Sequence, residues 1–149
     1  MIYDANEKYI AVNQNDEIIE IYEIPNEIEN SKSKIKLLCK IKETEIIKDL
    51  QLNPNYLNVL LVGTYHEIKF FVIPETTQEK LIEKPRFVFN KFSSAFNSAV
   101  FNPFNSHIIA SSFDDFTILF WSVKEPFIHE LKCRDIPTQM KWHKNGNLL

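Results

Sequence analysis

The chain has 149 residues, of which 44% are hydrophobic, so it is long enough and apolar enough to form a packed core. Its 17 basic and 20 acidic side chains leave a formal net charge of −3, which gives no electrostatic basis for binding nucleic acid or an anionic membrane. The N-terminal residues lack the basic and apolar segments of a signal peptide, and no apolar run approaches the length of a membrane span. We therefore expect a cytoplasmic protein.

Short apolar segments alternate with polar turns along the chain, and no segment shows a sustained helical period. These segments are rich in β-branched and aromatic residues, which is typical of buried strands. In chain order, strands are predicted at 8–13, 17–24, 34–41, 47–52, 58–63, 67–73, within 80–89, and at 98–102, 107–111, 117–123 and 127–132. Pro85 falls within 80–89, so this strand is expected at a sheet edge, where a residue without a backbone N–H is tolerated.

The turns between these strands are rich in asparagine, while the whole chain has only 2 glycines. Asparagine adopts a positive φ more readily than most other residues that carry a side chain. We therefore predict that asparagine replaces glycine at the left-handed positions of the turns, at Asn15, Asn55, Asn105 and Asn145.

An internal repeat divides the chain. Tyr22 lies 49 residues before Phe71, which lies 50 residues before Trp121, and all three lie in strand-like runs that align with one another. The pairs Asn53-Pro54 and Asn102-Pro103 are also 49 residues apart. A period of about 40 to 50 residues with four strands in each repeat is typical of β-propellers, whose repeats are called blades.

The repeat predicts blades at about residues 1–43, 44–90 and 91–133, with the start of a further blade at 134–149. The first blade is expected to be partial, because no strand is predicted before residue 8. A propeller needs about four to eight blades to close into a ring. We therefore expect an all-β chain that is a fragment of a longer protein. The alternatives are a shortened gene product and an open stack completed by a partner.

The third repeat carries the most informative sequence. An Asn-Pro turn at Asn102-Pro103 leads into a strand at 107–111, then an acidic turn and a strand that ends near Trp121. This order resembles a WD repeat, and residues 101–121 resemble the coronin family, with a likeness that extends over residues 53–123. The resemblance implies a WD-repeat β-propeller with about three blades plus the start of a fourth. It also implies a protein-interaction scaffold that organises the actin cytoskeleton and associates with it in the cytoplasm.

Residues 1–45 depart from the coronin pattern, because the short basic Ser-Lys-Arg stretch that opens coronins, and through which they partly bind actin filaments, is absent. The basic run of this chain is SKSKIKLLCKIK, in which Lys32, Lys34 and Lys36 are the candidate partner-binding residues. Such a run can form a strip for an acidic partner, such as an actin filament or acidic lipid. The alternative is an outer strand whose solvated edge is protected by lysines.

The resemblance to WD repeats assigns a structural hydrogen-bond network within the third blade to Ser111, Asp115 and Trp121. A turn carboxylate can order its turn by accepting backbone N–H groups, and a buried indole N–H requires an acceptor. A histidine completes this network in WD repeats, but Phe92 occupies its position here. The network is therefore expected to have at most three members.

No motif for catalysis, a cofactor or a metal stands out. The adjacent Asp114 and Asp115 would need further ligands or partners for metal binding or acid–base chemistry, and none is close in sequence. The 4 histidines show no metal-ligand spacing, and 2 glycines are too few for a glycine-rich phosphate loop. We predict no enzyme, no cofactor and no metal site, and we expect Cys39 and Cys133 to be reduced thiols.

Two other functions stay open on the sequence. The chain could be a WD-repeat scaffold of another assembly, such as a ubiquitin-ligase receptor or a trafficking complex. The sequence Trp121-Ser122-Val123-Lys124 loosely resembles the Trp-Asp-x-Arg of such receptors. An enzyme is the third interpretation, and only the acidic pair supports it. In both scaffold interpretations the partners are proteins, with no role for nucleic acid or a transmembrane segment.

Overall fold

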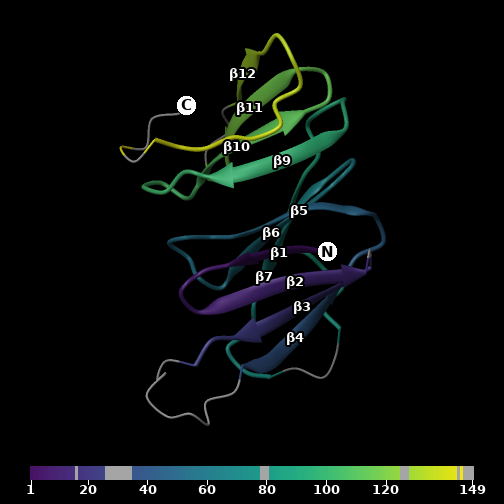
Figure 1. Ribbon diagram of the computed structural model, residues 1–149, viewed down its shortest axis with the longest axis vertical. Coiled ribbons are helices and arrows are strands. Elements are labelled where there is room, and N and C mark those ends of the chain that lie inside the picture. Colours follow the sequence, from purple (N-terminus) through teal and green to yellow (C-terminus); the bar gives the residue numbers. More distant parts are fainter. Residues whose placement is uncertain (16, 26–34, 78–80, 125–127, 144, 146–149) are drawn as a thin grey trace.

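Three antiparallel sheets make up the structure, which is a computed structural model (Figure 1). It describes residues 1–15, 17–25, 35–77, 81–124, 128–143 and 145. The described part of the chain contains no helix, and hence none that could cross a membrane. Figure 1 shows the sheets stacked along the longest axis of the molecule, with the sheet of β5 to β8 in the middle. The predicted all-β class is confirmed.

Within each sheet the strands follow one another without a crossover. The first sheet contains β1 (Ile2–Ala5), β2 (Tyr9–Asn15), β3 (Ile18–Glu23) and β4 (Lys36–Lys42). The second contains β5 (Ile47–Leu52), β6 (Val59–Thr64), β7 (Ile68–Val72) and β8 (Phe87–Phe89). The third contains β9 (Phe96–Phe101), β10 (Ile108–Phe113), β11 (Thr117–Ser122) and β12 (Ile128–Lys132). The inner strands β1, β5 and β9 contact one another in that order.

The first sheet has four strands, so the prediction of a partial first blade is wrong. β1 pairs with β2 from Ile2 opposite Asn13 to Ala5 opposite Ile10. Its side chains alternate between half-buried and exposed, and Tyr3 is 69% exposed. A strand this short, without an apolar run, gives no periodic signal that distinguishes it from a loop.

The segment after β12 forms no strand among its described residues, although the start of a further blade is predicted there. Met140 is buried in a small cluster with Ala110 and Ile118, and Trp142 packs beside them. The indole N–H of Trp142 donates to the carbonyl of Val100 at 3.2 Å. Because side chains alternate across a strand, this cluster lies on the face of the third sheet that points away from the second.

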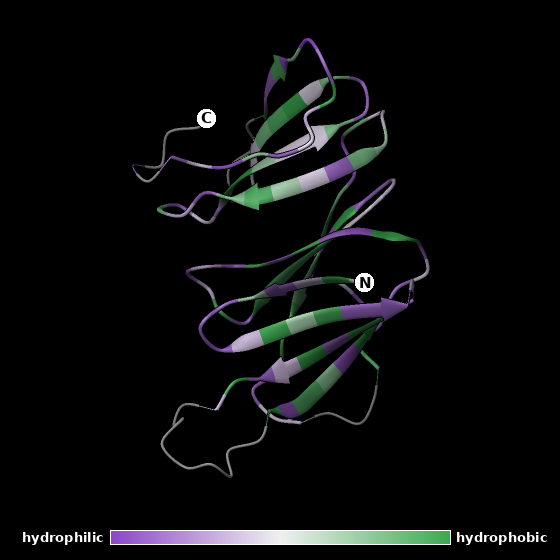
Figure 2. Cartoon of the chain, in the orientation of Figure 1, coloured by the Kyte–Doolittle hydropathy of each residue, from purple (hydrophilic) through white to green (hydrophobic). Residues whose placement is uncertain are grey.

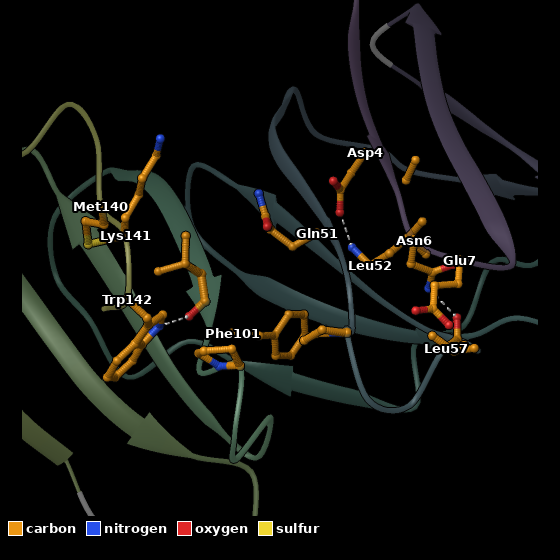
Figure 3. A pocket seen from close by; sticks show the side chains of 14 residues that line it. Asp4, Asn6, Glu7, Gln51, Leu52, Leu57, Phe101, Met140, Lys141 and Trp142 are labelled. Carbon is orange, nitrogen blue, oxygen red and sulfur yellow. Dashed lines mark hydrogen bonds between the residues drawn. The ribbon is translucent and has the colours of Figure 1, made fainter. Parts of the chain in front are cut away.

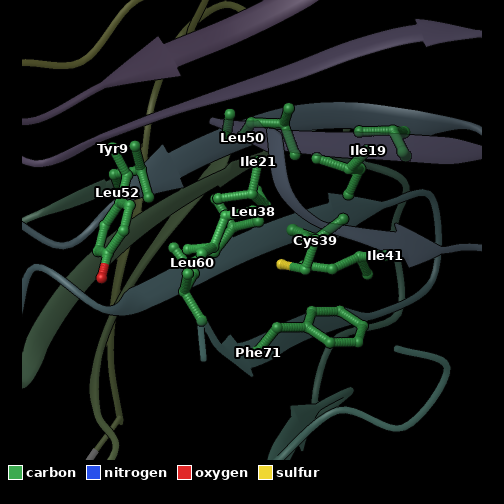
Figure 4. Close-up of a cluster of buried hydrophobic side chains, with 14 residues drawn as sticks. Tyr9, Ile19, Ile21, Leu38, Cys39, Ile41, Leu50, Leu52, Leu60 and Phe71 are labelled. Carbon is green, nitrogen blue, oxygen red and sulfur yellow. The ribbon is translucent and has the colours of Figure 1, made fainter. Parts of the chain in front are cut away.

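Two apolar layers separate the sheets. The layer between the first and second sheets includes Tyr9, Ile19 and Phe71, which are fully buried (Figure 4). The layer between the second and third contains Trp121, whose ring stacks on Phe89 with centroids 3.9 Å apart. Figure 2 shows β2 as hydrophobic over much of its length and hydrophilic toward its end. Burial alternates along the strand, with Tyr9, Ala11 and Asn13 buried, as expected for a strand with one face in a layer. The strands β6 and β7 lie between both layers and are buried at nearly every residue.

The glycine in β6 is required by packing. A Cβ atom on Gly63 would lie 2.0 Å from the Cε1 atom of Phe96, which belongs to the third sheet. Phe96 is fully buried, so its ring has little space into which to move. Gly63 therefore permits the close approach of two sheets.

The asparagines do not adopt positive φ angles, so that prediction is wrong. Among the described residues other than glycine, the only positive φ belongs to Phe116, at 67°. The asparagines act through their side chains instead. Asn15 Oδ1 accepts the N–H of Ile18 at 3.0 Å, and Asn105 Oδ1 accepts the N–H of His107 at 3.2 Å. Such hydrogen bonds stabilise turns that have ordinary backbone angles.

Replacing Gly63 with alanine should lower the free energy of unfolding by about 1–3 kcal/mol, the usual range for overpacking a core. The added methyl group must displace the ring of Phe96. The further change Phe96→Leu shortens the opposing side chain, so it should cost less in the Gly63→Ala background than in the wild type. Urea denaturation of the wild type, both single variants and the double variant measures this coupling. Strictly additive losses would contradict the contact.

Candidate functional site

Two of the three residues predicted for the blade network are in contact. The indole N–H of Trp121 in β11 donates to Ser111 Oγ in β10 at 3.1 Å, and both side chains are fully buried. Ile109 is paired opposite Trp121, so Ser111 is the diagonal neighbour on the same face of the sheet. The hydroxyl gives the buried indole the acceptor that it requires.

Asp115 lies in the turn between β10 and β11 and acts within that turn. Its Oδ1 atom accepts the N–H of Thr117 at 3.3 Å and the hydroxyl of Thr117 at 2.5 Å. The described hydrogen bonds of Asp115 thus do not join it to Ser111 or Trp121. Asp114 and Asp115 are both exposed. The described residues contain no group of three or more acidic, histidine or cysteine side chains that could hold a metal ion.

Phe92, at the position of the WD-repeat histidine, belongs to an aromatic cluster. Its ring centroid lies 4.6 Å from that of Phe113 and 6.0 Å from that of Phe89. A phenyl ring has no N–H to donate, so packing replaces the polar link at this position of the blade.

The lysine run leads into β4. Lys32 and Lys34 lie outside the described residues, whereas Lys36 is the first residue of β4 and is exposed. Lys40 forms an ion pair with Glu20 of β3, with 2.6 Å between Nζ and Oε1. This hydrogen bond lowers the pKa of Glu20. Lys36 therefore presents its charge to solvent, while that of Lys40 is paired within the sheet.

The outer edge of β4 is paired at one point near the end of the strand, while Lys36 and Lys42 are exposed. Ile82 forms a parallel bridge with Ile41. The N–H of Ile82 donates to the carbonyl of Lys40, and its carbonyl accepts the N–H of Lys42, both at 2.9 Å. The connection between β7 and β8 therefore adds a short backbone pairing to the edge of the first sheet.

A repeated asparagine organises the loop between the first and second strands of every sheet. Its side-chain oxygen accepts the N–H groups two and three residues later, at 2.8–2.9 Å, and the three asparagines are Asn6, Asn53 and Asn102. The Nδ2 atom of Asn6 also donates to the carbonyl of Leu57 in the next sheet, at 2.9 Å, and that of Asn53 donates to the carbonyl of Ser106, at 3.5 Å. These bonds join the three loops into one surface, which we call the Asn-loop face.

Aromatic side chains are exposed on the Asn-loop face. Phe104 is 67% exposed and Tyr56 is 48% exposed. The Tyr56 hydroxyl lies 3.2 Å from His107 Nε2, so the two loops also touch through side chains. Partial burial and the nearby charge of Lys124 lower the pKa of His107. Exposed aromatic residues on joined loops are a common feature of protein-binding surfaces.

A cleft of about 520 Å³ opens between the Asn-loop face and the inner strands (Figure 3). Its apolar wall includes Leu52, Leu57, Phe101, Met140 and Trp142, and its polar groups include Asp4, Glu7, Gln51 and Lys141. Figure 3 shows Met140 and Trp142 on one side of the cleft and Asp4 and Glu7 on the other. Its described lining residues include no serine, cysteine or histidine.

Two carboxylates of the inner strands bond to the next inner strand. Asp4 of β1 accepts the N–H of Leu52 in β5 at 2.5 Å, and Asp49 of β5 accepts the N–H of Ala99 in β9 at 2.9 Å. Burial raises the pKa of Asp49 to about 6, although hydrogen bonds from Ala99 and Gln51 favour the charged form. Burial also raises the pKa of Asp4. These bonds align the inner strands that border the cleft.

Sequence reasoning misses the inner-strand side of this site. Asp4 and Asp49 do not occupy equivalent positions of the repeat, so no repeat signal identifies them. The turn asparagines do repeat, because Asn6, Asn53 and Asn102 are 47 and 49 residues apart. That spacing is the signal that could have identified the Asn-loop face.

We compared the chain with known protein families, curated proteins and solved structures. Neither a protein-family model nor a curated protein matches the chain. Among solved structures, the chain is similar to the WD40 domain of Toxoplasma gondii coronin, with a TM-score of 0.79 and 25% sequence identity. The match covers 97% of this chain and 38% of that chain, so this chain spans less than two-fifths of its length. The prediction of a WD-repeat β-propeller fold, most like that of coronin, is confirmed.

Removing the Trp121 side chain should destabilise the chain strongly. Trp121→Ala should cost about 3–5 kcal/mol, as is typical for a large buried aromatic residue. Trp121→Phe should cost less, because it keeps part of the stacking on Phe89, although it loses the bond to Ser111 and leaves a smaller cavity. Trp142→Ala is the control, since Trp142 is only half-buried and should contribute less. Denaturation midpoints measure all three, and a midpoint unaffected by Trp121→Ala would exclude Trp121 from the core.

Ionisation of Asp49 should oppose folding. Its pKa rises from the ordinary 3.8 to about 6 in the folded chain, so the folded state holds a proton that the unfolded state has released. The contribution of Asp49 to the free energy of unfolding should therefore fall as the pH rises from about 4 to about 6, by at most about 3 kcal/mol. Asp49→Asn keeps an acceptor for Ala99 and should remove this fall.

The measurement is urea denaturation of both proteins across this pH range. The exposed change Asp135→Asn, which removes one carboxylate elsewhere, should leave the pH dependence as in the wild type. Parallel stability curves for the wild type and Asp49→Asn would contradict the raised pKa.

Proposed function

We propose that this chain is a coronin-like interaction scaffold that binds actin filaments. The observation that carries the proposal is the structural similarity to a coronin WD40 domain over 97% of the chain. The sequence resemblance over residues 53–123 points to the same family. A WD-repeat propeller fold serves as a scaffold for protein–protein interaction.

The polar side chains of the described interior support a scaffold more than an enzyme. Ser111, Asp49 and Asn53 all hydrogen-bond within or between the sheets, so these groups hold the structure together. The exposed features that remain suit a macromolecular partner. They are the aromatic residues of the Asn-loop face, the cleft beside the inner strands and Lys36 at the start of β4.

The lysine run is the candidate contact for actin filaments. Lys36 is exposed at the start of β4, at the outer edge of the first sheet, and Lys32 and Lys34 precede it in the sequence. Three lysines within five residues form a dense positive charge, which attracts an acidic surface such as that of a filament. A cytoplasmic, cytoskeleton-associated location follows from this proposal.

Co-sedimentation with filamentous actin tests the proposal. The chain should pellet with filaments, and less of it should pellet at high salt, because salt screens exposed charges beyond about 8 Å at physiological ionic strength. The triple variant Lys32→Glu, Lys34→Glu, Lys36→Glu should pellet several-fold less. The change at Lys36, which is exposed, should alter stability by less than about 0.5 kcal/mol, as is usual for exposed substitutions.

The matched control reverses three other exposed basic residues, as Lys84→Glu, Lys132→Glu and Arg134→Glu, and should pellet like the wild type. If both variants lost pelleting equally, actin binding would depend on net charge alone, and the lysine run would no longer be the candidate contact. A folded wild type that does not pellet would overturn actin binding. It would leave a WD-repeat scaffold of another assembly, such as a ubiquitin-ligase receptor or a trafficking complex.

A further inference from the structure

The outer strands β4 and β8 differ in the backbone pairing of their outer edges. The edge of β4 is paired between Lys40 and Lys42, where Ile82 forms two backbone hydrogen bonds of 2.9 Å. Ile82 lies in the connection between β7 and β8, which has 14 residues, since β7 ends at Val72 and β8 begins at Phe87. The chain therefore contains an example of an extended segment that adds to a blade edge.

The edge of β8 has no such pairing among the residues that the structure describes. β8 pairs with β7, and no described residue forms a backbone hydrogen bond to its other side. The corresponding connection in the third sheet, between β11 and β12, has only five residues, from 123 to 127. Phe87 and Val88 of β8 remain 40% and 37% exposed. An uncovered apolar strand edge is a template for pairing with another chain.

A groove runs beside this edge. Its volume is about 340 Å³, and its walls come from β8 and from the neighbouring part of the third sheet. Phe87 and Val88 form the β8 side, and Val123 and Ile128 form apolar parts of the opposite side. Its base includes Trp121 and Phe89, whose stacked rings belong to the buried layer. The groove therefore places apolar side chains next to a strand edge that no described residue pairs with.

The charge of the groove selects the partner. Lys91 and Lys124 line it and both are exposed, and its described lining includes no acidic residue. An apolar side chain with acidic neighbours suits this lysine-bordered strand edge, because the apolar group enters the groove while the carboxylates meet the lysines.

We infer that the β8 edge and its groove form a binding site for an extended acidic segment of a partner protein. The segment adds one strand beside β8, as Ile82 does beside β4, and places an isoleucine or leucine side chain in the groove. Aspartate or glutamate residues on either side of it pair with Lys91 and Lys124. This site lies on a different sheet from the lysine run and does not depend on actin binding.

A fluorescent hexapeptide with a Leu-Ile pair between two glutamates on each side is the probe. Fluorescence anisotropy with the 149-residue chain should show saturable binding that weakens with salt. The double variant Lys91→Glu, Lys124→Glu should weaken it by about tenfold or more, since two exposed charge pairs become repulsive. The double variant Lys42→Glu, Arg134→Glu changes the net charge equally and should bind like the wild type. Loss of binding in both variants, or in neither, would overturn the site.

Backbone pairing is tested separately. A probe with a methyl group on the isoleucine amide nitrogen cannot donate there and should bind at least several-fold more weakly. The normal probe should protect amides of residues 87–89 from hydrogen exchange. Equal binding of the two probes, or protection elsewhere, would overturn strand addition. The inference would also be overturned if the folded chain failed to bind the probe. It would likewise be overturned by concentration-dependent dimers that Val88→Lys abolishes, because these would show that a second copy of the chain occupies the edge. The double variant Lys91→Glu, Lys124→Glu should still pellet with actin filaments, so the peptide site and the actin contact can be tested independently.

Discussion

Face-to-face packing between neighbouring sheets is the interaction on which the rest of the structure depends. A single sheet has no core of its own, because its apolar side chains point toward the adjacent sheet. The stacking of Trp121 on Phe89 and the close approach of Phe96 to Gly63 fix the distance between the second and third sheets. Repeat architectures are stabilised in this way, since each unit buries its apolar surface against its neighbours.

The packing distance also decides which polar groups meet between the sheets. Once the inner strands lie side by side, the carboxylate of Asp49 reaches an N–H group of the third sheet. Elsewhere, Lys69 of β7 lies 2.8 Å from Glu43, in the segment after β4, and both side chains are shielded from water. Such a pair adds little net stability, but separating it is costly. Packing therefore supplies the stability, while these polar contacts disfavour other alignments of the sheets.

Local signals in the sequence predict most of the strands, because periodicity and turn chemistry act over a few residues. The contact of Trp121 with Ser111 is predicted from the resemblance to WD repeats. Local signals do not predict β1, whose four residues have no apolar run. They also do not show whether asparagine makes a turn through φ or through its side chain, since the residue type is compatible with both. The bridge from Ile82 to Ile41 depends on the path of a connection, which no periodic pattern specifies.

Features that do not repeat are where specificity for a partner arises. The repeated asparagines join loops and so serve every sheet alike. By contrast, Ile82 in the long connection between β7 and β8 pairs with β4, whereas no described residue pairs with the outer edge of β8. The lysine run occurs only before β4. An open apolar edge and a basic run on different sheets can engage different partners at once, because neither surface includes residues of the other. A protein that brings two partners together requires this separation.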